Sequence, residues 1–289
     1  MKKLLPFSSL LCLVNIALAQ KAITLKLNLK KGVTYYTETT INQEIQLQQP
    51  KAPVSMKQTF TFGYDMKVSG VTDSGTIIET TYRKVKLSMM NMEFNSDTPS
   101  AGNPMFQKIF GNMVNKSFWI VVNKNGTITS VKGMHDLVST MIKDLPANPQ
   151  MESNLRNEYN DAKMLQSFNQ SFDIYAAGPV KPGSTWNKKQ TTSLLGNGTS
   201  TAAYSLISLN KKIASLQATT AHDLEMSIGA GGKLSGTSTS NWVVDTKSGF
   251  PLKGKTEMTL EGKMKNGDGY TPARIISSIL ISGTIKNKK

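Results

Sequence analysis

Residues 59–68, Thr-Phe-Thr-Phe-Gly-Tyr-Asp-Met-Lys-Val, alternate polar and apolar side chains without a break. Successive side chains of a β-strand point to opposite faces, whereas a helix with one apolar face repeats every three or four residues. The stretch therefore predicts a strand with one buried face, and it is the clearest such pattern in the chain. The side chains expected on the buried face are Phe60, Phe62, Tyr64, Met66 and Val68.

The same alternation recurs on both sides of this strand, with turn residues between the repeats. Thr72-Asp73-Ser74-Gly75 has the composition of a hairpin turn. Within residues 77–94 the apolar positions move from one face to the other, so we expect a long strand with a bulge or a bend. Further strands are expected at 23–29, 33–47, 186–195, 199–209, 212–228, 233–245, 251–264 and 272–286.

The middle of the chain has a different pattern, in which apolar residues recur at helical spacing. Helices are expected around 106–113, around 137–142 and over 152–172. Between the first two, a short hairpin over 118–131 is expected to turn at Lys124-Asn125-Gly126. The fold class is therefore mainly β (α+β), with long antiparallel curved sheet and a helical insert around 103–175.

The segments Leu29–Tyr35 and Val180–Trp186 match in residue type at an apolar residue, a lysine, a glycine, a threonine and an aromatic residue. Each would begin a β-meander, so the chain divides into a segment 20–102, an insert 103–178 and a segment 179–289. The pattern leaves open whether the two related meanders form separate sheets or one continuous domain over 20–289.

Residues 1–19 have the form of a cleavable export signal. Two lysines follow Met1, a short apolar run follows them, and Ala17-Leu18-Ala19 supplies small residues for cleavage between Ala19 and Gln20. Cys12, the chain's one cysteine, lies inside the apolar run; lipid attachment there is the alternative, but Leu11 before it does not suit such a site. We expect a protein exported to the periplasm or the cell surface, with no transmembrane segment in the mature chain.

The charge balance is strongly basic. The chain has a net charge of +15, which becomes +13 when Lys2 and Lys3 leave with the signal. A basic protein can bind nucleic acid or anionic lipid. The lysines are dispersed along strands and at turns, however, and the mature chain has few arginines, which suit phosphate recognition best. We therefore expect no specific nucleic-acid binding, and we treat an anionic envelope component as a possible partner.

No arrangement typical of catalysis or metal binding is found in the sequence. His135 and His222 are far apart and neither has a second ligand at metal-binding spacing. No Gly-x-Ser-x-Gly motif is present, although a Ser–His–Asp site assembled from distant segments stays open. We expect no enzymatic activity, no catalytic residues, no metal and no cofactor.

Methionine and aromatic residues are concentrated in the middle of the chain. A lining of flexible Met and planar Phe side chains can adapt to an irregular apolar ligand, and the same side chains can also simply pack helices against a sheet. Both interpretations stay open. The residues expected to bind such a ligand are Met89, Met92, Phe94, Phe106, Phe110, Met113 and Trp119, and we call them the Met–Phe set.

Three segments carry a family resemblance: the strand start Leu29–Tyr35, the segment Asn123–Gly133 before a helix, and the hairpin Trp242–Pro251. With the signal segment, they make the chain resemble a family of exported Bacteroidota proteins of unknown function. More distantly the chain resembles the periplasmic lipoprotein-carrier fold, a half-barrel sheet covered by helices. That resemblance implies binding of acyl chains, and no carrier residue maps onto this chain one for one.

The sequence thus predicts an exported, non-enzymatic binding protein that holds a lipid or another apolar ligand between a curved sheet and helices. The alternative is a structural or interaction protein of the cell envelope that contacts anionic glycans or lipids.

Overall fold

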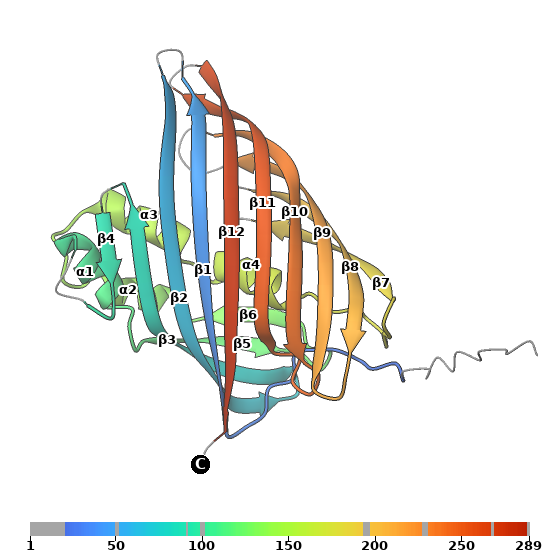
Figure 1. The fold of residues 1–289 in the computed structure, drawn as a ribbon. Coiled ribbons are helices and arrows are strands. Elements are labelled where there is room, and N and C mark those ends of the chain that lie inside the picture. Colours follow the sequence, from blue (N-terminus) through green and yellow to red (C-terminus); the bar gives the residue numbers. More distant parts are fainter. Residues whose placement is uncertain are drawn as a thin grey trace, which may run out of the picture.

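The computed structural model describes residues 21–49, 52–90, 92–98, 102–192, 197–226, 231–266 and 269–287. These residues form one long, open antiparallel sheet with helices on one side of it (Figure 1). The expected mainly β architecture is confirmed. The signal segment, its cleavage position Ala19–Gln20 and Cys12 lie outside the described residues.

The described sheet has twelve strands in the order β6-β5-β3-β2-β1-β12-β11-β10-β9-β8-β7, with β4 paired to β3 beside this path. Their bounds are β1 Val33–Gln48, β2 Pro53–Thr72, β3 Gly75–Met89, β4 Met92–Asn95, β5 Ser117–Val122, β6 Ile128–Lys132, β7 Thr185–Thr192, β8 Asn197–Leu209, β9 Ile213–Met226, β10 Gly232–Asp245, β11 Pro251–Asn266 and β12 Gly269–Asn287.

The first and last strands of the chain join the two meanders into one sheet. β1 pairs with β12 along its whole length, from Val33 opposite Asn287 to Leu47 opposite Ala273. β1 pairs on its other side with β2, and β12 with β11. The sequence left open whether the two related meanders form separate sheets, and the structure shows that they form one continuous sheet.

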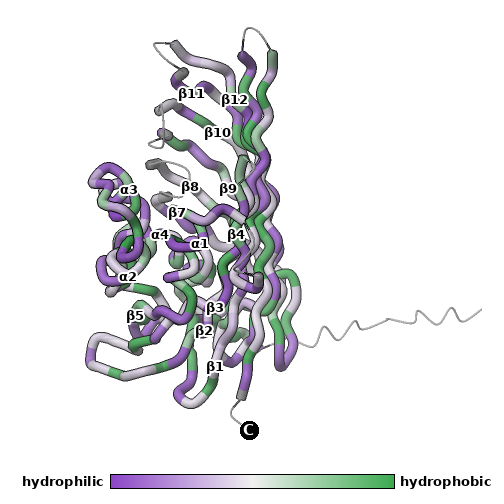
Figure 2. The backbone as a smooth tube through the Cα atoms, turned by 90° about the vertical axis from the view of Figure 1, so that its left-hand side faces the viewer, coloured by the Kyte–Doolittle hydropathy of each residue, from purple (hydrophilic) through white to green (hydrophobic). Residues whose placement is uncertain are grey.

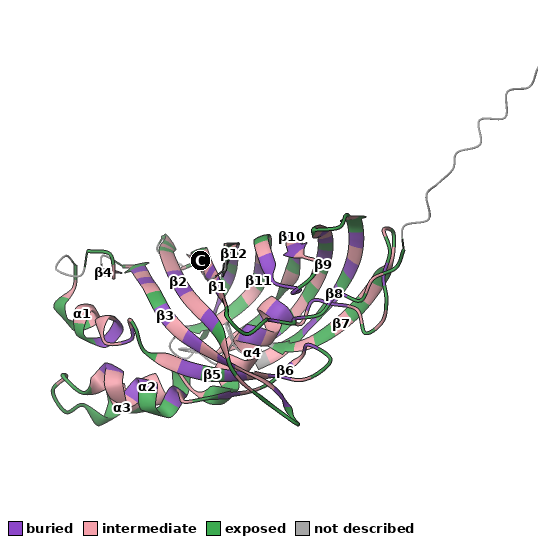
Figure 3. Ribbon diagram, turned by 90° about the horizontal axis from the view of Figure 1, so that it is seen from below, coloured by how far each residue is buried: buried purple, intermediate pink, exposed green. Residues whose placement is uncertain are grey.

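Four helices lie between β4 and β7 in the described chain: α1 Pro104–Gly111, α2 Met134–Ile142, α3 Pro149–Glu158 and α4 Asp161–Phe172. The helix α4 packs against both β6 and β7, the strands at the two ends of the sheet order. Just after α4, the Trp186 Nε1–H of β7 donates to the carbonyl of Ile174 at 3.1 Å. The sheet therefore curves into a trough, and α4 connects its two edges (Figure 3).

One predicted helix is two helices. The pattern over 152–172 predicts an uninterrupted helix, whereas the chain breaks between Glu158 and Asp161. Asn160 is extended there, and its side chain accepts the backbone N–H of Lys163, which caps the first turn of α4. Asparagine favours this capping position over a helix interior because its side chain competes for backbone hydrogen bonds.

The expected long, bent strand over 77–94 is also wrong, because the chain folds back on itself. β3 ends at Met89 and β4 begins at Met92, directly opposite it. Met90 has a left-handed backbone with φ of 47°. The apolar face shifts there because the chain reverses direction, which a period-two pattern cannot distinguish from a bulge.

The predicted strand at 23–29 is extended chain without a ladder. Ile23 forms one isolated bridge, with Val180, and Asn28 donates to the carbonyl of Ser248. Leu25, Leu27 and Leu29 are buried between exposed neighbours. The alternation correctly identified a segment with one buried face, but the segment packs on the core through side chains.

The two matched sequence segments adopt the same turn. Gly32 and Gly183 have left-handed φ values of 82° and 86°. In each turn a backbone N–H donates to the carbonyl three residues earlier, from Val33 to Lys30 and from Ser184 to Lys181. Each turn leads into a strand, β1 or β7, so the sequence match reflects an equivalent local structure.

Candidate functional site

The sheet has two chemically different faces. Phe168 of α4 lies against Tyr64 of β2 and Phe118 of β5, with ring centroids 5.8 and 5.6 Å apart. We call the face that meets the helices the inner face and the opposite one the outer face. Side chains alternate along each strand, and the pairings of β1 with β2 and β12 and of β12 with β11 have no register shift, so these contacts assign the paired residues of those strands to one face or the other. The pairing extends the assignment to β8–β10 as far as the register shifts at Val243/Val244 and Leu206/Ser208.

Most of the Met–Phe set lies in the packed core beneath the helices. Phe94 and Met113 are 2% and 0% exposed, and Phe110 is also buried. The Phe110 ring lies 6.1 Å from Phe94 and 5.3 Å from Phe106, centroid to centroid. These four side chains belong to one hydrophobic cluster that joins α1 and α2 to the sheet.

The remaining members of the set lie elsewhere. Met89 and Met92 face each other at the turn between β3 and β4, and both are half-buried. Trp119 is 41% exposed, and its ring edge lies near Gly133 at the start of α2. The structure therefore brings Phe94, Phe106, Phe110 and Met113 together by packing, while a ligand-binding role for the set stays a prediction.

A belt of polar side chains crosses the inner face near the middle of the long strands. On one side, Gln58 donates to Gln43, whose Nε2 donates to the Oγ of Ser277 at 3.2 Å. On the other side, His222 lies between two serine hydroxyls: its Nδ1 is 2.8 Å from the Oγ of Ser200, and its Nε2 is 2.9 Å from the Oγ of Ser238. We call these six side chains the polar belt.

His222 is half-buried, and burial lowers its pKa. Its ring is therefore neutral at pH 7, with one nitrogen donating and the other accepting. A serine hydroxyl can do either, so Ser200 and Ser238 satisfy the ring in both tautomers. This belt could not be found from sequence, because its members come from six strands and nothing in their local patterns distinguishes them from other polar residues.

Beyond the polar belt, the inner face is apolar again. This end carries the hairpins β1–β2, β9–β10 and β11–β12, and its strands continue past the helices (Figure 2). Its hydrophobic cluster contains strand residues alone, unlike the core beneath the helices. We call this region the distal inner face. Its buried members are Leu224, Leu234, Met258, Leu260, Ala273 and Ile275, and its half-buried members are Ile45, Leu47 and Met264, to which the register adds Val54 and Met56.

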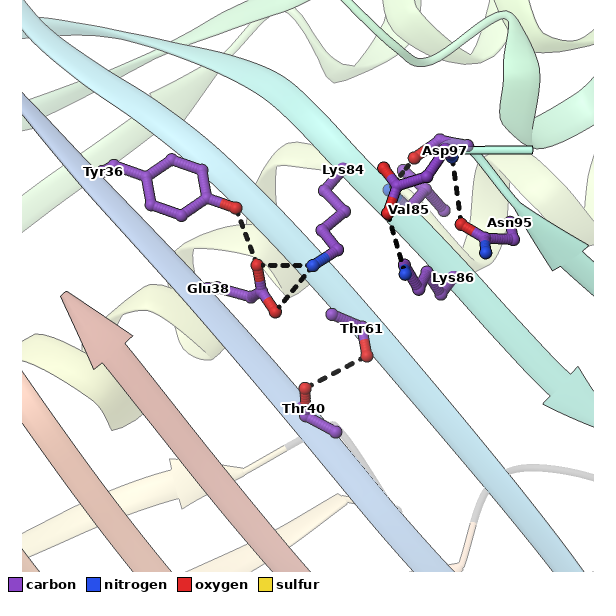
Figure 4. Close-up of polar contacts among 10 residues, drawn as sticks. Tyr36, Glu38, Thr40, Thr61, Lys84, Val85, Lys86, Asn95 and Asp97 are labelled. Atoms are coloured by element: carbon purple, nitrogen blue, oxygen red, sulfur yellow. Dashed lines mark hydrogen bonds and ion pairs between the residues drawn. The ribbon is translucent and has the colours of Figure 1, made fainter. Parts of the chain in front are cut away.

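The charges of the long strands lie on the outer face. Lys84 Nζ contacts both carboxylate oxygens of Glu38 at 3.0 and 2.9 Å, and Tyr36 donates to the same carboxylate (Figure 4). Lys86 pairs with Asp97 at 2.8 Å. At the inward positions of β1, β2 and β8–β12 within the described residues, the register places no Asp, Glu, Lys or Arg.

A shallow hollow of about 680 Å³ extends across β2, β1, β12, β11 and β10. Three adjacent transverse rows of residues line it: two outward rows and, between them, the inward row Gln58, Gln43, Ser277, Met258 and Ser238. The first row is Lys57, Glu44, Ile276, Thr259 and Thr237, and the second is Thr59, Asn42, Ser278, Glu257 and Thr239. A smaller hollow of about 280 Å³ lies beside residues 26–29. Neither hollow is lined by the Met–Phe set.

The histidines do not form a triad with the groups shown beside them. The partners of His222 are two serines, and its neighbour Asp223 points to the outer face. His135 is exposed and contacts Arg156. Within the described parts of the chain, no group of three or more His, Cys, Asp or Glu side chains could hold a metal ion. Over the same residues, none of the helices is both long and apolar enough to cross a bilayer.

A protein-family model, described as a family of unknown function (DUF6263), matches residues 73–251, which is more than half of the chain. The chain therefore belongs to this family. This confirms the coarse expectation of a family without a known function. No curated protein matches the sequence.

Among solved structures, the fold is similar to part of lipovitellin, in a structure that describes lipid–protein interactions in lipovitellin. The TM-score is 0.54 at 10% sequence identity, and the match covers 90% of this chain but 26% of the lipovitellin chain. An outer membrane channel from Pseudomonas putida F1 matches with a TM-score of 0.23 at 10% identity, over 89% of this chain and 97% of that one. The likeness to lipovitellin is one of fold.

Proposed function

We propose that this member of the DUF6263 family is a non-enzymatic protein that binds a lipid on the distal inner face of its sheet. The observation that carries the proposal is an apolar, uncharged region at the end of the trough where the helices do not pack, whose members Leu234, Leu260 and Ile275 are buried against one another. Its edge on β1 and β2, formed by Ile45, Leu47 and Met56, is partly exposed and is the part open to a ligand. An apolar surface of this kind favours burial of acyl chains, by about 25 cal/mol for each Å² removed from water.

The similarity to lipovitellin supports the same proposal at the level of fold. Lipovitellin is described in terms of its lipid contacts, and the likeness spans nearly the whole of this chain. The residues proposed here differ from the Met–Phe set. Most side chains of the Met–Phe set are buried in the core beneath the helices. Ile45, Leu47 and Met56 are instead half-buried on a part of the sheet that no helix covers.

We place this activity outside the cytoplasm, in the periplasm or at the cell surface, after cleavage between Ala19 and Gln20. The support is the form of residues 1–19. A lipid-binding trough in that compartment agrees with the resemblance to lipoprotein carriers, which belongs to this proposal and not to the established family.

The test uses the chain without residues 1–19 and an uncharged, polarity-sensitive fluorescent dye as the apolar probe. We expect saturable binding, weakened about tenfold in Met56→Gln, because burying a methionine side chain contributes about 1.5–3 kcal/mol. Lys57→Gln is the matched control, since Lys57 is the next residue on the same strand and faces outward. Absence of dye binding, or equal loss in both variants, would overturn the proposal.

A second candidate is an envelope interaction protein that contacts anionic lipids or glycans through its outer face. The confinement of the long strands' charges to that face, together with the basic net charge, favours it. Binding to vesicles of anionic lipid should then fall steeply as salt rises from 50 to 500 mM, because exposed charges are screened. Attachment that does not change with salt would exclude it.

A further inference from the structure

Along seven long strands, the inner face has no charged side chain within the described residues. Within the described residues, the inward positions of β1, β2 and β8–β12 carry apolar, glycine, hydroxyl, amide or imidazole groups. The outward positions of the same strands carry the charges, among them Glu44, Lys57, Glu257, Lys263 and Arg274. A charged lipid headgroup placed in the trough would find no counter-ion on these strands.

One cation on the inner side of the sheet, Lys188, is already paired. Lys188 lies at an inward position of β7, opposite Ala202, which is two residues along β8 from Ser200 of the polar belt. Its ammonium forms an ion pair with Asp173, at the end of α4, and both side chains are less than a third exposed. A ligand carboxylate or phosphate would therefore have to compete with the Asp173 carboxylate for Lys188.

The polar belt can nevertheless satisfy an uncharged polar group. His222 and its two serines adjoin the distal inner face, because Leu224 follows two residues later on the same strand and pairs with Leu234. The hydroxyls can rotate to donate to an ester carbonyl or to accept from a ligand hydroxyl. Acyl chains on the distal inner face would bring such a group to the belt.

Resting on the proposed function, we infer that the ligand is an uncharged lipid, whose ester or hydroxyl groups meet Ser200, His222 and Ser238 while its chain lies on the distal inner face. Burying an unpaired charge costs far more than burying a hydrogen-bonded ester. The chemistry thus selects acylglycerols or similar neutral lipids over fatty acids and anionic phospholipids.

The test is displacement of the uncharged dye from the wild-type chain by three lipids with one oleoyl chain: monooleoylglycerol, oleate at pH 8 and oleoyl-lysophosphatidylglycerol. We expect monooleoylglycerol to bind about tenfold or more tighter than either anion. Equal or tighter binding of an anion would overturn this inference and leave the proposed function standing. If the dye does not bind and none of the three lipids binds, the proposed function fails and this inference fails with it.

A charge introduced on the inner face by substitution gives a second, independent test of this inference. Met56→Lys should raise the affinity for oleate relative to monooleoylglycerol about tenfold, because it supplies the missing counter-ion at a half-buried inward position. Ser55→Lys adds the same charge to the outward side of that strand and should leave the ratio unchanged. Equal shifts in both variants would contradict recognition by the inner face. If Met56→Lys does not fold, as circular dichroism would show, the wild-type comparison still decides.

Discussion

Phe168 of α4 lies against Tyr64 of β2, with ring centroids 5.8 Å apart, although the two residues are more than one hundred positions apart in sequence. Phe168 is 5% exposed and also contacts Phe118 and Phe172. This contact holds α4 over the inner face, between the two edges of the sheet. It is therefore part of the packing that holds α4 across the trough.

Removing the Phe168 ring should destabilise the protein strongly. We expect Phe168→Ala to lower the free energy of unfolding by about 3–5 kcal/mol, from lost burial and the cavity left behind. Denaturant unfolding followed by circular dichroism measures the change. Lys108→Ala, at an exposed position of α1, is the control and should change stability by about 0.5 kcal/mol or less. Similar losses in both variants would show that α4 is not held in this way.

Met113 distinguishes packing from ligand binding within the Met–Phe set. It is 0% exposed. Met113→Ala should therefore lower the free energy of unfolding by about 2–5 kcal/mol. At temperatures where the variant is folded, its affinity for the fluorescent dye should stay within about twofold of wild type. A tenfold loss of affinity in a stably folded variant would instead assign the ligand to the Met–Phe set.

His222 makes stability depend on pH. Burial lowers the pKa of this base in the folded state, so below about pH 6.5 the unfolded chain binds the proton more readily than the folded chain does. The contribution of the neutral ring is complete above that pH and is lost as pH falls from there toward the lower, folded pKa. Stability should therefore decrease on acidification.

The measurement is the difference in melting temperature between pH 7.5 and pH 5.0. We expect a smaller difference in His222→Gln than in wild type, because glutamine keeps hydrogen-bonding groups but does not titrate. His135→Gln, which replaces the exposed histidine, should keep the wild-type difference. If His135→Gln alone removes it, the assignment to His222 is wrong.

Gly236 allows β10 and β11 to approach each other on the inner face. A Cβ at this position would overlap the carbonyl oxygen of Thr259 on the paired strand. Gly236→Ala should thus force the strands apart and cost about 1–3 kcal/mol of stability. Gly70→Ala is a matched strand control, because its Cβ would lie 3.6 Å from the nearest side chain, an ordinary contact. Equal stability of the two variants would contradict the close approach.

The local elements could be predicted because their causes are local. The alternation around Phe60–Val68, the Asp73–Ser74 turn and the hairpin at Lys124–Gly126 depend on neighbouring residues alone. The prediction of element boundaries failed where a cap or a turn interrupts a periodic pattern. The capping of α4 by Asn160 and the reversal at Met90 each interrupt a periodic pattern that otherwise continues.

By itself, the sequence determined that the chain is mainly β, that helices interrupt it and that each strand has one apolar face. Only the tertiary structure decided that Val33 pairs with Asn287, that α4 connects the two edges, and that Ser200, His222 and Ser238 meet. The physical reason is that the alternation of apolar and polar residues specifies which side chains share a face of the sheet. It does not specify which strands pair with each other. Pairing between distant strands depends on the packing of the whole sheet.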